Sequence, residues 1–270
     1  MSFLQAIILG IVQGLTEFIP VSSSGHLVLA QHYFGIESVD NITFEVFMHL
    51  GTLLAVLIFF HKQIWELILS LFYWKPNLKN EVHRQNRSVI VYLIIATLVT
   101  GVFYLIFKDM LKQAYQSPLL VSFMLIITGA MIFASDFVKN TSIPASGTGF
   151  LKSAFIGLAQ GLAIMPGISR SGATITASLL CGIKRKDAAH FSFLLSIPAI
   201  LAANLSEFSA LISLDTRVLG IYLAGFISSF VAGYLVIAVL IRLIQAGSLK
   251  YFAYYVWLVA ITSITFILMS

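Results

Sequence analysis

The feature that most constrains this chain is a polar motif that occurs twice within an apolar sequence. The segment QGLTEFIPVSSSGH at residues 13–26 recurs as QGLAIMPGISRSGA at residues 160–173, and the match between the two copies has no gap. Internal repeats of this kind are typical of membrane proteins built from two related halves. We therefore predict that the chain is a duplication.

The two copies of the motif differ at positions that could carry chemistry. The first copy has a carboxylate, a hydroxyl and an imidazole where the second has isoleucine, arginine and alanine: Glu17/Ile164, Ser23/Arg170 and His26/Ala173. Carboxylate, hydroxyl and imidazole groups serve as acids, bases and nucleophiles, and arginine binds phosphate through two parallel hydrogen bonds. Together the copies predict a site that handles a phosphate group.

The composition excludes a soluble domain. The chain is 59% hydrophobic and 10% charged, with a mean hydropathy of +0.96. Its long apolar runs are residues 45–60, 88–107, 118–135, 218–241 and 252–269. Each run approaches or reaches the roughly 20 residues that a helix needs to cross a bilayer. We predict an all-α integral membrane protein, formed by residues 1–270 as a single membrane domain.

Each half of the chain follows the same plan. The motif segments, residues 3–34 and 150–182, are interrupted by proline and glycine, which predicts a re-entrant helix–loop–helix in each. Three transmembrane helices follow in each repeat, and the repeats are predicted at residues 1–138 and 149–270. Because three is an odd number, the second repeat would lie upside down relative to the first. This inverted repeat predicts a site near the bilayer midplane.

The basic residues predict the orientation in the membrane. If both termini lie on one side, three basic residues share that side: Lys108, Lys112 and Arg217. Twelve lie opposite: Lys62, Lys75, Lys79, Arg84, Arg87, Lys139, Lys152, Lys184, Arg185, Lys186, Arg242 and Lys250. Since cytoplasmic loops carry an excess of lysine and arginine, both termini are predicted outside. This topology accounts for the net charge of +5, so nucleic acid is not an expected partner.

Glu17 is an ionisable residue in an apolar segment, which by default indicates function. Gln13 lies four residues earlier, on the same helical face. Divalent cations such as Mg²⁺ bind carboxylate and amide oxygens. Gln13 and Glu17 are therefore predicted metal ligands, with substrate phosphates completing the coordination.

Two serine- and glycine-rich loops precede helical segments, where backbone N–H groups can bind an anion. The predicted substrate-binding residues in these loops are Ser22, Ser24, Gly25, Ser169, Ser171, Gly172 and Thr174. Arg170 is the predicted phosphate clamp, while Glu17, Ser23 and His26 complete the predicted catalytic set. Either Ser23 or His26 could be the nucleophile. A further pair, Glu45 and His49, lies four residues apart near the start of the first spanning segment, and the sequence leaves open whether the pair lines the cavity.

These motifs, QGLTEFIPVSSSGH and PGISRSGAT (residues 166–174), resemble those of the bacterial undecaprenyl pyrophosphate phosphatases, the family tied to bacitracin resistance. The resemblance covers essentially the whole chain. It implies an inner-membrane enzyme that converts C55 isoprenyl pyrophosphate to the monophosphate carrier lipid for cell-wall synthesis, using a divalent cation, usually Mg²⁺. It maps the serine, histidine and arginine of the family onto Ser23, His26 and Arg170. Membrane lipid is a further expected partner, and a homodimer is left open.

Two other classes of protein share features with this chain. Membrane transporters and lipid flippases often have inverted repeats with broken helices. However, Glu17, Ser23 and His26 occur in one copy only, which favours an enzyme. A second class of membrane phosphatase needs a histidine six residues after its arginine, and this chain has Thr176 there.

Overall fold

The computed structural model describes residues 1–36, 41–72, 81–208, 215–246 and 249–269. Its helices are α1 (Phe3–Phe18), α2 (Ser23–Tyr33), α3 (Asn41–Phe59), α4 (His61–Phe72), α5 (Glu81–Ala114), α6 (Pro118–Ser135), α7 (Phe150–Leu162), α8 (Arg170–Leu180), α9 (Arg185–Ser206), α11 (Thr216–Ala246) and α12 (Lys250–Met269). A short 3₁₀ helix, η1 (Ala145–Gly147), precedes α7. Helices α5, α6, α9, α11 and α12 are each long and apolar enough to span a membrane. The predicted all-α fold of a multi-pass membrane protein is confirmed.

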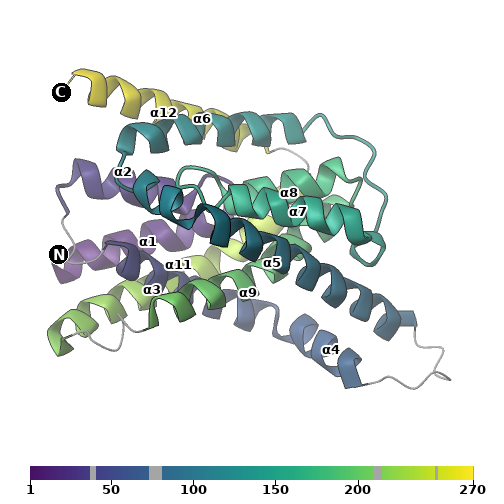
Figure 1. Ribbon diagram of the computed structural model, residues 1–270. Coiled ribbons are helices and arrows are strands. Elements are labelled where there is room, and N and C mark those ends of the chain that lie inside the picture. Colours follow the sequence, from purple (N-terminus) through teal and green to yellow (C-terminus); the bar gives the residue numbers. More distant parts are fainter. Residues whose placement is uncertain (37–40, 73–80, 209–214, 247–248, 270) are drawn as a thin grey trace.

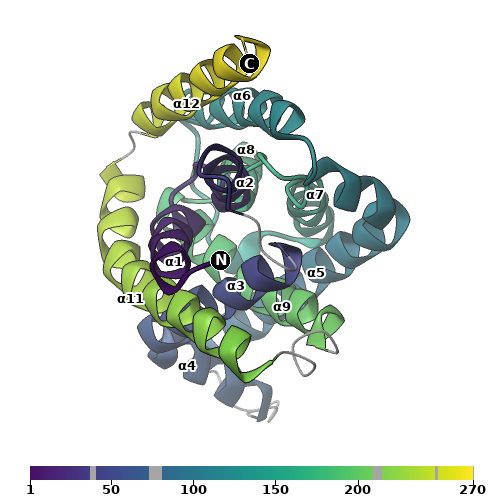
Figure 2. The same cartoon turned by 90° about the vertical axis from the view of Figure 1, so that its left-hand side faces the viewer.

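The long helices surround the short motif helices (Figure 2). Seen end-on, α5, α6, α11 and α12 lie on the outside, and α2, α7 and α8 lie within them. Nearly every residue of α8 is buried. The start of α1 and the end of α12 lie at the same end of the bundle, on the left in Figure 1. This placement agrees with the prediction that both termini share one side.

Each motif segment is a pair of short helices, as predicted. The first pair breaks after Phe18, because Pro20 cannot continue the hydrogen-bonded ladder and disfavours helical backbone at the residue before it. The second pair breaks after Leu162, ahead of Pro166 and Gly167, and Gly167 has a φ of 93° that favours glycine. The breaks place two helix N-termini, those of α2 and α8, inside the protein.

The first helix of each copy packs against a long helix of the other half. In α1, a Cβ atom at Gly10 or Gly14 would collide with the backbone of α11. In α7, the equivalent Gly157 would collide with the backbone of α5 at Ala96. Small residues spaced four apart let membrane helices approach closely. The packing is thus reciprocal between the halves, although the repeat bounds at 138 and 149 stay a prediction.

The apolar run 45–60 forms α3, but the helical path continues beyond it as α4. The two helices are bent by 77° at a short break, and together they qualify as one broken span. At the bend, Phe60 packs against Phe193 of α9, and the His61 Nδ1–H donates to the Ile58 carbonyl at 2.7 Å. In repeat 2 the equivalent helix, α9, likewise ends at Ser206, the residue that aligns with Phe59 of α3. The sequence analysis did not predict this bend.

Candidate active site

The loops between the motif helices meet in the protein interior. The Ser171 hydroxyl of the second loop donates to the Ile19 carbonyl of the first at 3.3 Å. A Cβ atom built on Gly25 would lie 3.1 Å from the Cα atom of Gly167. Gly25 therefore allows close approach of the two loops, which brings the N-termini of α2 and α8 together.

Each of these N-termini is capped by a serine. The Ser22 hydroxyl accepts from the Gly25 N–H at 3.2 Å, and the Ser169 hydroxyl accepts from the Gly172 N–H at 3.1 Å. Such caps fix the first turn, whose remaining N–H groups and positive dipole end favour an anion. Ser22 has a φ of 70°, an uncommon left-handed value for a residue other than glycine, which marks local backbone strain in the first loop.

The Glu17 carboxylate lies at the junction of the two loops and is only 6% exposed. Its Oε1 atom accepts from Arg170 Nη2 at 2.5 Å. Its Oε2 atom accepts from Ser23 Oγ at 2.7 Å and from Gln13 Nε2 at 3.0 Å. A buried carboxylate is stable only when it is paired and hydrogen-bonded, and residues from both motifs provide these partners here.

Ser23, the first residue of α2, faces a cavity of about 180 Å³. Its hydroxyl donates to a carboxylate, which is the arrangement that activates a serine nucleophile. The cavity is lined by polar residues from both repeats, including Glu17, Ser23, Ser24, Glu45, His49, Tyr115 and Arg170. A phosphate placed there would face a nucleophile, a base and a fixed cation.

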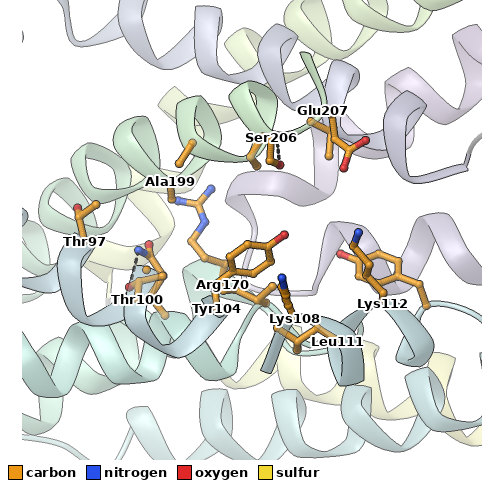
Figure 3. A pocket seen from close by; sticks show the side chains of 17 residues that line it. Thr97, Thr100, Tyr104, Lys108, Leu111, Lys112, Arg170, Ala199, Ser206 and Glu207 are labelled. Carbon is orange, nitrogen blue, oxygen red and sulfur yellow. Dashed lines mark hydrogen bonds between the residues drawn. The ribbon is translucent and has the colours of Figure 1, made fainter. Parts of the chain in front are cut away.

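Arg170 begins α8 and lines two adjoining cavities. One amine of its guanidinium contacts Glu17, and the other, Nη1, donates to the Ser192 carbonyl at 3.4 Å. Figure 3 shows the side chain reaching toward the α9 wall near Ala199. Because a guanidinium has five donors, it can keep Glu17 as a partner and still bind phosphate oxygens.

A family model for the bacitracin resistance protein BacA matches residues 6–262 of this chain. The chain is also similar to curated undecaprenyl-diphosphatases. It is 44% identical to that of Treponema denticola over 94% of both chains, and 40% identical to that of Methanosphaera stadtmanae over 98% of both. This chain belongs to the BacA family. The family resemblance predicted from the two motifs is confirmed.

In this BacA-family chain, the predicted residue His26 points away from the cavity. Its Nδ1–H donates to the Ser22 carbonyl at 2.8 Å, and its Nε2 accepts from the Tyr255 hydroxyl at 3.0 Å. The imidazole also stacks on the Tyr255 ring of α12. Its catalytic role stays a prediction, and its contacts here are those of a residue that holds the first loop against α12.

The remaining predicted substrate-binding residues divide into two groups. Ser24 lines the cavity with Glu17 and Ser23. The others are engaged within the loops: Ser22 and Ser169 cap helices, Gly25 and Gly172 supply the capped N–H groups, Ser171 joins the loops, and Thr174 contacts the Ser192 hydroxyl at 2.6 Å. These contacts hold the two loops in place around the cavity.

Glu45 and His49, whose place the sequence had left open, both line the cavity. His49 Nε2 lies 3.3 Å from Glu17 Oε2, and its Nδ1–H donates to the Glu45 carbonyl at 2.8 Å. Both ring nitrogens face acceptor oxygens, so a ring that carries both protons would satisfy both contacts. In that protonated form His49 is a second cationic partner of Glu17 besides Arg170.

Three residues of the site were not predicted. Tyr115 lines the cavity and hydrogen-bonds Ser24, and burial, with the charges of Glu45 and Glu17, raises the pKa of its hydroxyl well above the usual range. The Thr128 hydroxyl accepts from the Ser169 N–H at 3.0 Å and donates to the Gly167 carbonyl. Ser192 contacts Arg170 and Thr174. They lie on elements remote from the motifs, and nothing local in the sequence distinguishes them.

The residues around Glu17 also offer oxygen atoms to a cation. Gln13 Oε1 and Glu45 Oε1 are buried and accept no hydrogen bond within the described part of the protein. Carboxylate and amide oxygens are the ligands that hard divalent cations prefer. Gln13, Glu17 and Glu45 are therefore the residues that would hold Mg²⁺. They would need substrate phosphates as further ligands, because the described residues contain no group of three or more His, Cys, Asp or Glu side chains that could hold a metal ion.

Proposed function

We propose that this protein dephosphorylates undecaprenyl (C55 isoprenyl) pyrophosphate to undecaprenyl phosphate in the cytoplasmic membrane. One observation carries the proposal: Ser23 Oγ lies 2.7 Å from the Glu17 carboxylate, whose other oxygen contacts Arg170. A nucleophile, its base and a phosphate-binding cation thus meet in one buried cavity. The names of the BacA-family relatives support this substrate, and favour an enzyme over a transporter or flippase.

The geometry supports a two-step transfer through Ser23. In the first step Ser23 Oγ attacks the terminal phosphorus, and its proton passes to Glu17 Oε2. The bond between that phosphorus and the bridging oxygen breaks, and undecaprenyl phosphate leaves. As it leaves, the undecaprenyl phosphate oxygen takes this proton from Glu17. In the second step Glu17 accepts a proton from water, the water oxygen attacks the phosphorus of phosphoserine, and the bond between that phosphorus and Ser23 Oγ breaks. Glu17 returns the proton to Ser23 Oγ, and inorganic phosphate is released.

The surrounding residues stabilise the charge that develops on the phosphoryl oxygens. Arg170 is fixed by Glu17 and Ser192, so its donors need little reorganisation during the reaction. The protonated Tyr115 hydroxyl is a further donor in the cavity. Mg²⁺ held by Gln13, Glu17 and Glu45 would neutralise phosphate charge in addition.

The test is phosphate release from a long-chain isoprenyl pyrophosphate by the purified protein in detergent. We expect one inorganic phosphate per lipid monophosphate formed. Quenching the reaction of terminally ³²P-labelled substrate in acid should leave label on Ser23, whereas an adduct on His26 would survive base and be lost in acid. Absence of phosphate release from the folded protein would refute the proposed function.

The proposal includes the orientation of the chain, with both termini outside. After Cys181 is replaced by alanine, a cysteine at Ser2 should react with an impermeant thiol reagent in intact cells. A cysteine at residue 80, which lies outside the described residues, should not react. Labelling in the reverse pattern would refute this orientation but leave the proposed chemistry intact.

A further inference from the structure

A second cavity, of about 290 Å³, adjoins the one that contains Ser23. Arg170 and Tyr115 line both cavities, so the two share a boundary at these side chains. The second cavity runs between α5 and α9, and its α9 wall is made of small residues: Ala199, Ala202, Ala203 and Ser206. Figure 3 shows this space, with Arg170 and the α5 side chains facing α9. This cavity therefore offers a route along α5 to Arg170.

Two lysines lie along this route. Tyr104, Lys108 and Lys112 are spaced four residues apart on α5, and all three line the cavity. This spacing places them on one helix face, with a rise of about 6 Å from each to the next. Tyr104 is half-buried, whereas both lysines are exposed, so the lysines mark the open end of the cavity.

The two lysines are available to an anion. Among the described residues, no ion pair joins Lys108 or Lys112 to a carboxylate. Glu207 lies on the opposite wall and accepts a hydrogen bond from Thr43 at 3.2 Å. The C-terminal end of α5 favours cations, which accounts for a lysine in its last turn. The helix dipole does not account for two lysines on the face of α5 that lines the same cavity as Arg170.

We propose that Lys108 and Lys112 form a second phosphate-binding site at the mouth of this cavity. The inference rests on the proposed function, which supplies two ligands of the same chemistry. One is the pyrophosphate headgroup of the incoming lipid, and the other is the inorganic phosphate that leaves. Lysine binds phosphate as a flexible point charge, which suits a site that passes its ligand on to Arg170 or to the exterior.

The experiment compares wild-type protein with the double variant Lys108→Gln/Lys112→Gln in detergent. The first arm measures the KM for isoprenyl pyrophosphate, and the second measures inhibition by added inorganic phosphate. We expect at least one of these two constants to rise by about tenfold, while turnover at saturation falls by a smaller factor. A rise in KM identifies the lipid headgroup as the ligand, and a rise in the inhibition constant identifies free phosphate.

Salt and matched variants separate charge from structure. Lowering the ionic strength from about 0.15 M to about 0.01 M lengthens the Debye length from about 8 Å to about 30 Å, and should lower the affected constant more in the wild type than in the double glutamine variant. Lys108→Arg/Lys112→Arg should stay near wild type, and so should Arg217→Gln, which removes a positive charge away from the cavity. If the double variant has a lower thermal stability than the wild type, the same constants are measured on Lys108→Gln and Lys112→Gln separately. If neither constant changes while wild type releases phosphate, the second site is refuted and the proposed function is not.

Discussion

The two motif copies share a scaffold and differ in what they place on it. In both, a serine caps the helix through an N–H three residues later, and its hydroxyl lies near a second serine, at 3.4 Å for Ser22 and Ser24 and at 3.2 Å for Ser169 and Ser171. The first copy adds the Glu17 carboxylate and the Ser23 hydroxyl to this frame. The second adds the Arg170 guanidinium, which pairs with Glu17. The two copies thus share the residues that build the loops, and they differ at the residues that line the cavity.

The glutamines that begin the two copies show the same divergence. The Gln13 amide donates to Glu17 at 3.0 Å, while the Gln160 amide donates to the Thr100 hydroxyl of α5 at 3.1 Å. Position 164, equivalent to Glu17, is an isoleucine that lines the same cavity from the other side. One glutamine belongs to the site, and the other joins two helices. Matched substitutions in the two copies can therefore separate site effects from packing effects.

The largest difference between matched substitutions in the two copies is expected for the turnover of the serine variants. Ser23→Ala removes the proposed nucleophile and should reduce turnover by about a thousandfold or more, since losing a nucleophile removes the main reaction path. Ser171→Ala removes one hydroxyl that joins the loops and should reduce turnover by less than about tenfold. Turnover of both variants is measured at saturating substrate. Equal losses would mean that Ser23 also has only a structural role.

Arg170→Ala should reduce turnover by about a hundredfold or more. The transition state loses a fixed counter-charge, which typically costs about 3 kcal/mol. Arg170→Lys should recover little of this activity, because an ammonium cannot form two parallel hydrogen bonds. Retention of more than about a tenth of wild-type turnover by Arg170→Ala would contradict the role of the clamp.

Gln13→Glu should lower the Mg²⁺ concentration for half-maximal activity, because an added carboxylate tightens a divalent site. Gln160→Glu is its matched control in the second copy. Gln160→Glu should lower thermal stability by burying a charge beside Thr100, and it should leave the Mg²⁺ concentration for half-maximal activity unchanged. Glu17→Gln should abolish activity at every Mg²⁺ concentration. An unchanged half-saturation point in Gln13→Glu would remove Gln13 from the metal site.

The smallest difference is expected for the effect of replacing the two capping serines, Ser22 and Ser169, on the stability of the protein. Ser22→Gly relieves the left-handed backbone and loses only a few tenths of a kcal/mol of capping, so it should stabilise the protein by about 1 kcal/mol. Ser169 has an ordinary φ of −70°, so Ser169→Gly should only destabilise. Thermal unfolding in detergent measures both. Greater destabilisation by Ser22→Gly than by Ser169→Gly would show that the strain estimate has the wrong sign.

Much of the fold could be predicted because its signals are local. Apolar runs marked the spanning helices, and Pro20 and Pro166 marked the broken ones. The bend between α3 and α4 was missed, because no proline or glycine lies at residues 59–62 and because Phe60 packs against Phe193 of a distant helix. Local apolarity carries no information on such a contact.

The site could be predicted as far as its residues belong to the motifs. Glu17, Ser23 and Arg170 stood out because charged or polar groups are costly within membrane segments, and the structure brings them together. His26 stood out for the same reason, yet it faces Tyr255. Tyr115 was missed, because a tyrosine after a long helix is ordinary in a membrane protein. The direction of a side chain depends on tertiary packing that the motif does not encode.

The ion pair between Glu17 and Arg170 has a consequence for biosynthesis, because its partners are separated by 153 residues. At about 5–20 residues per second, a ribosome adds the arginine about 8–30 s after the glutamate. Until then the first loop has its nucleophile but no guanidinium, so the nascent chain cannot act on membrane lipids. Two halves expressed as separate chains should therefore be inactive alone and regain activity only when both are inserted in one membrane.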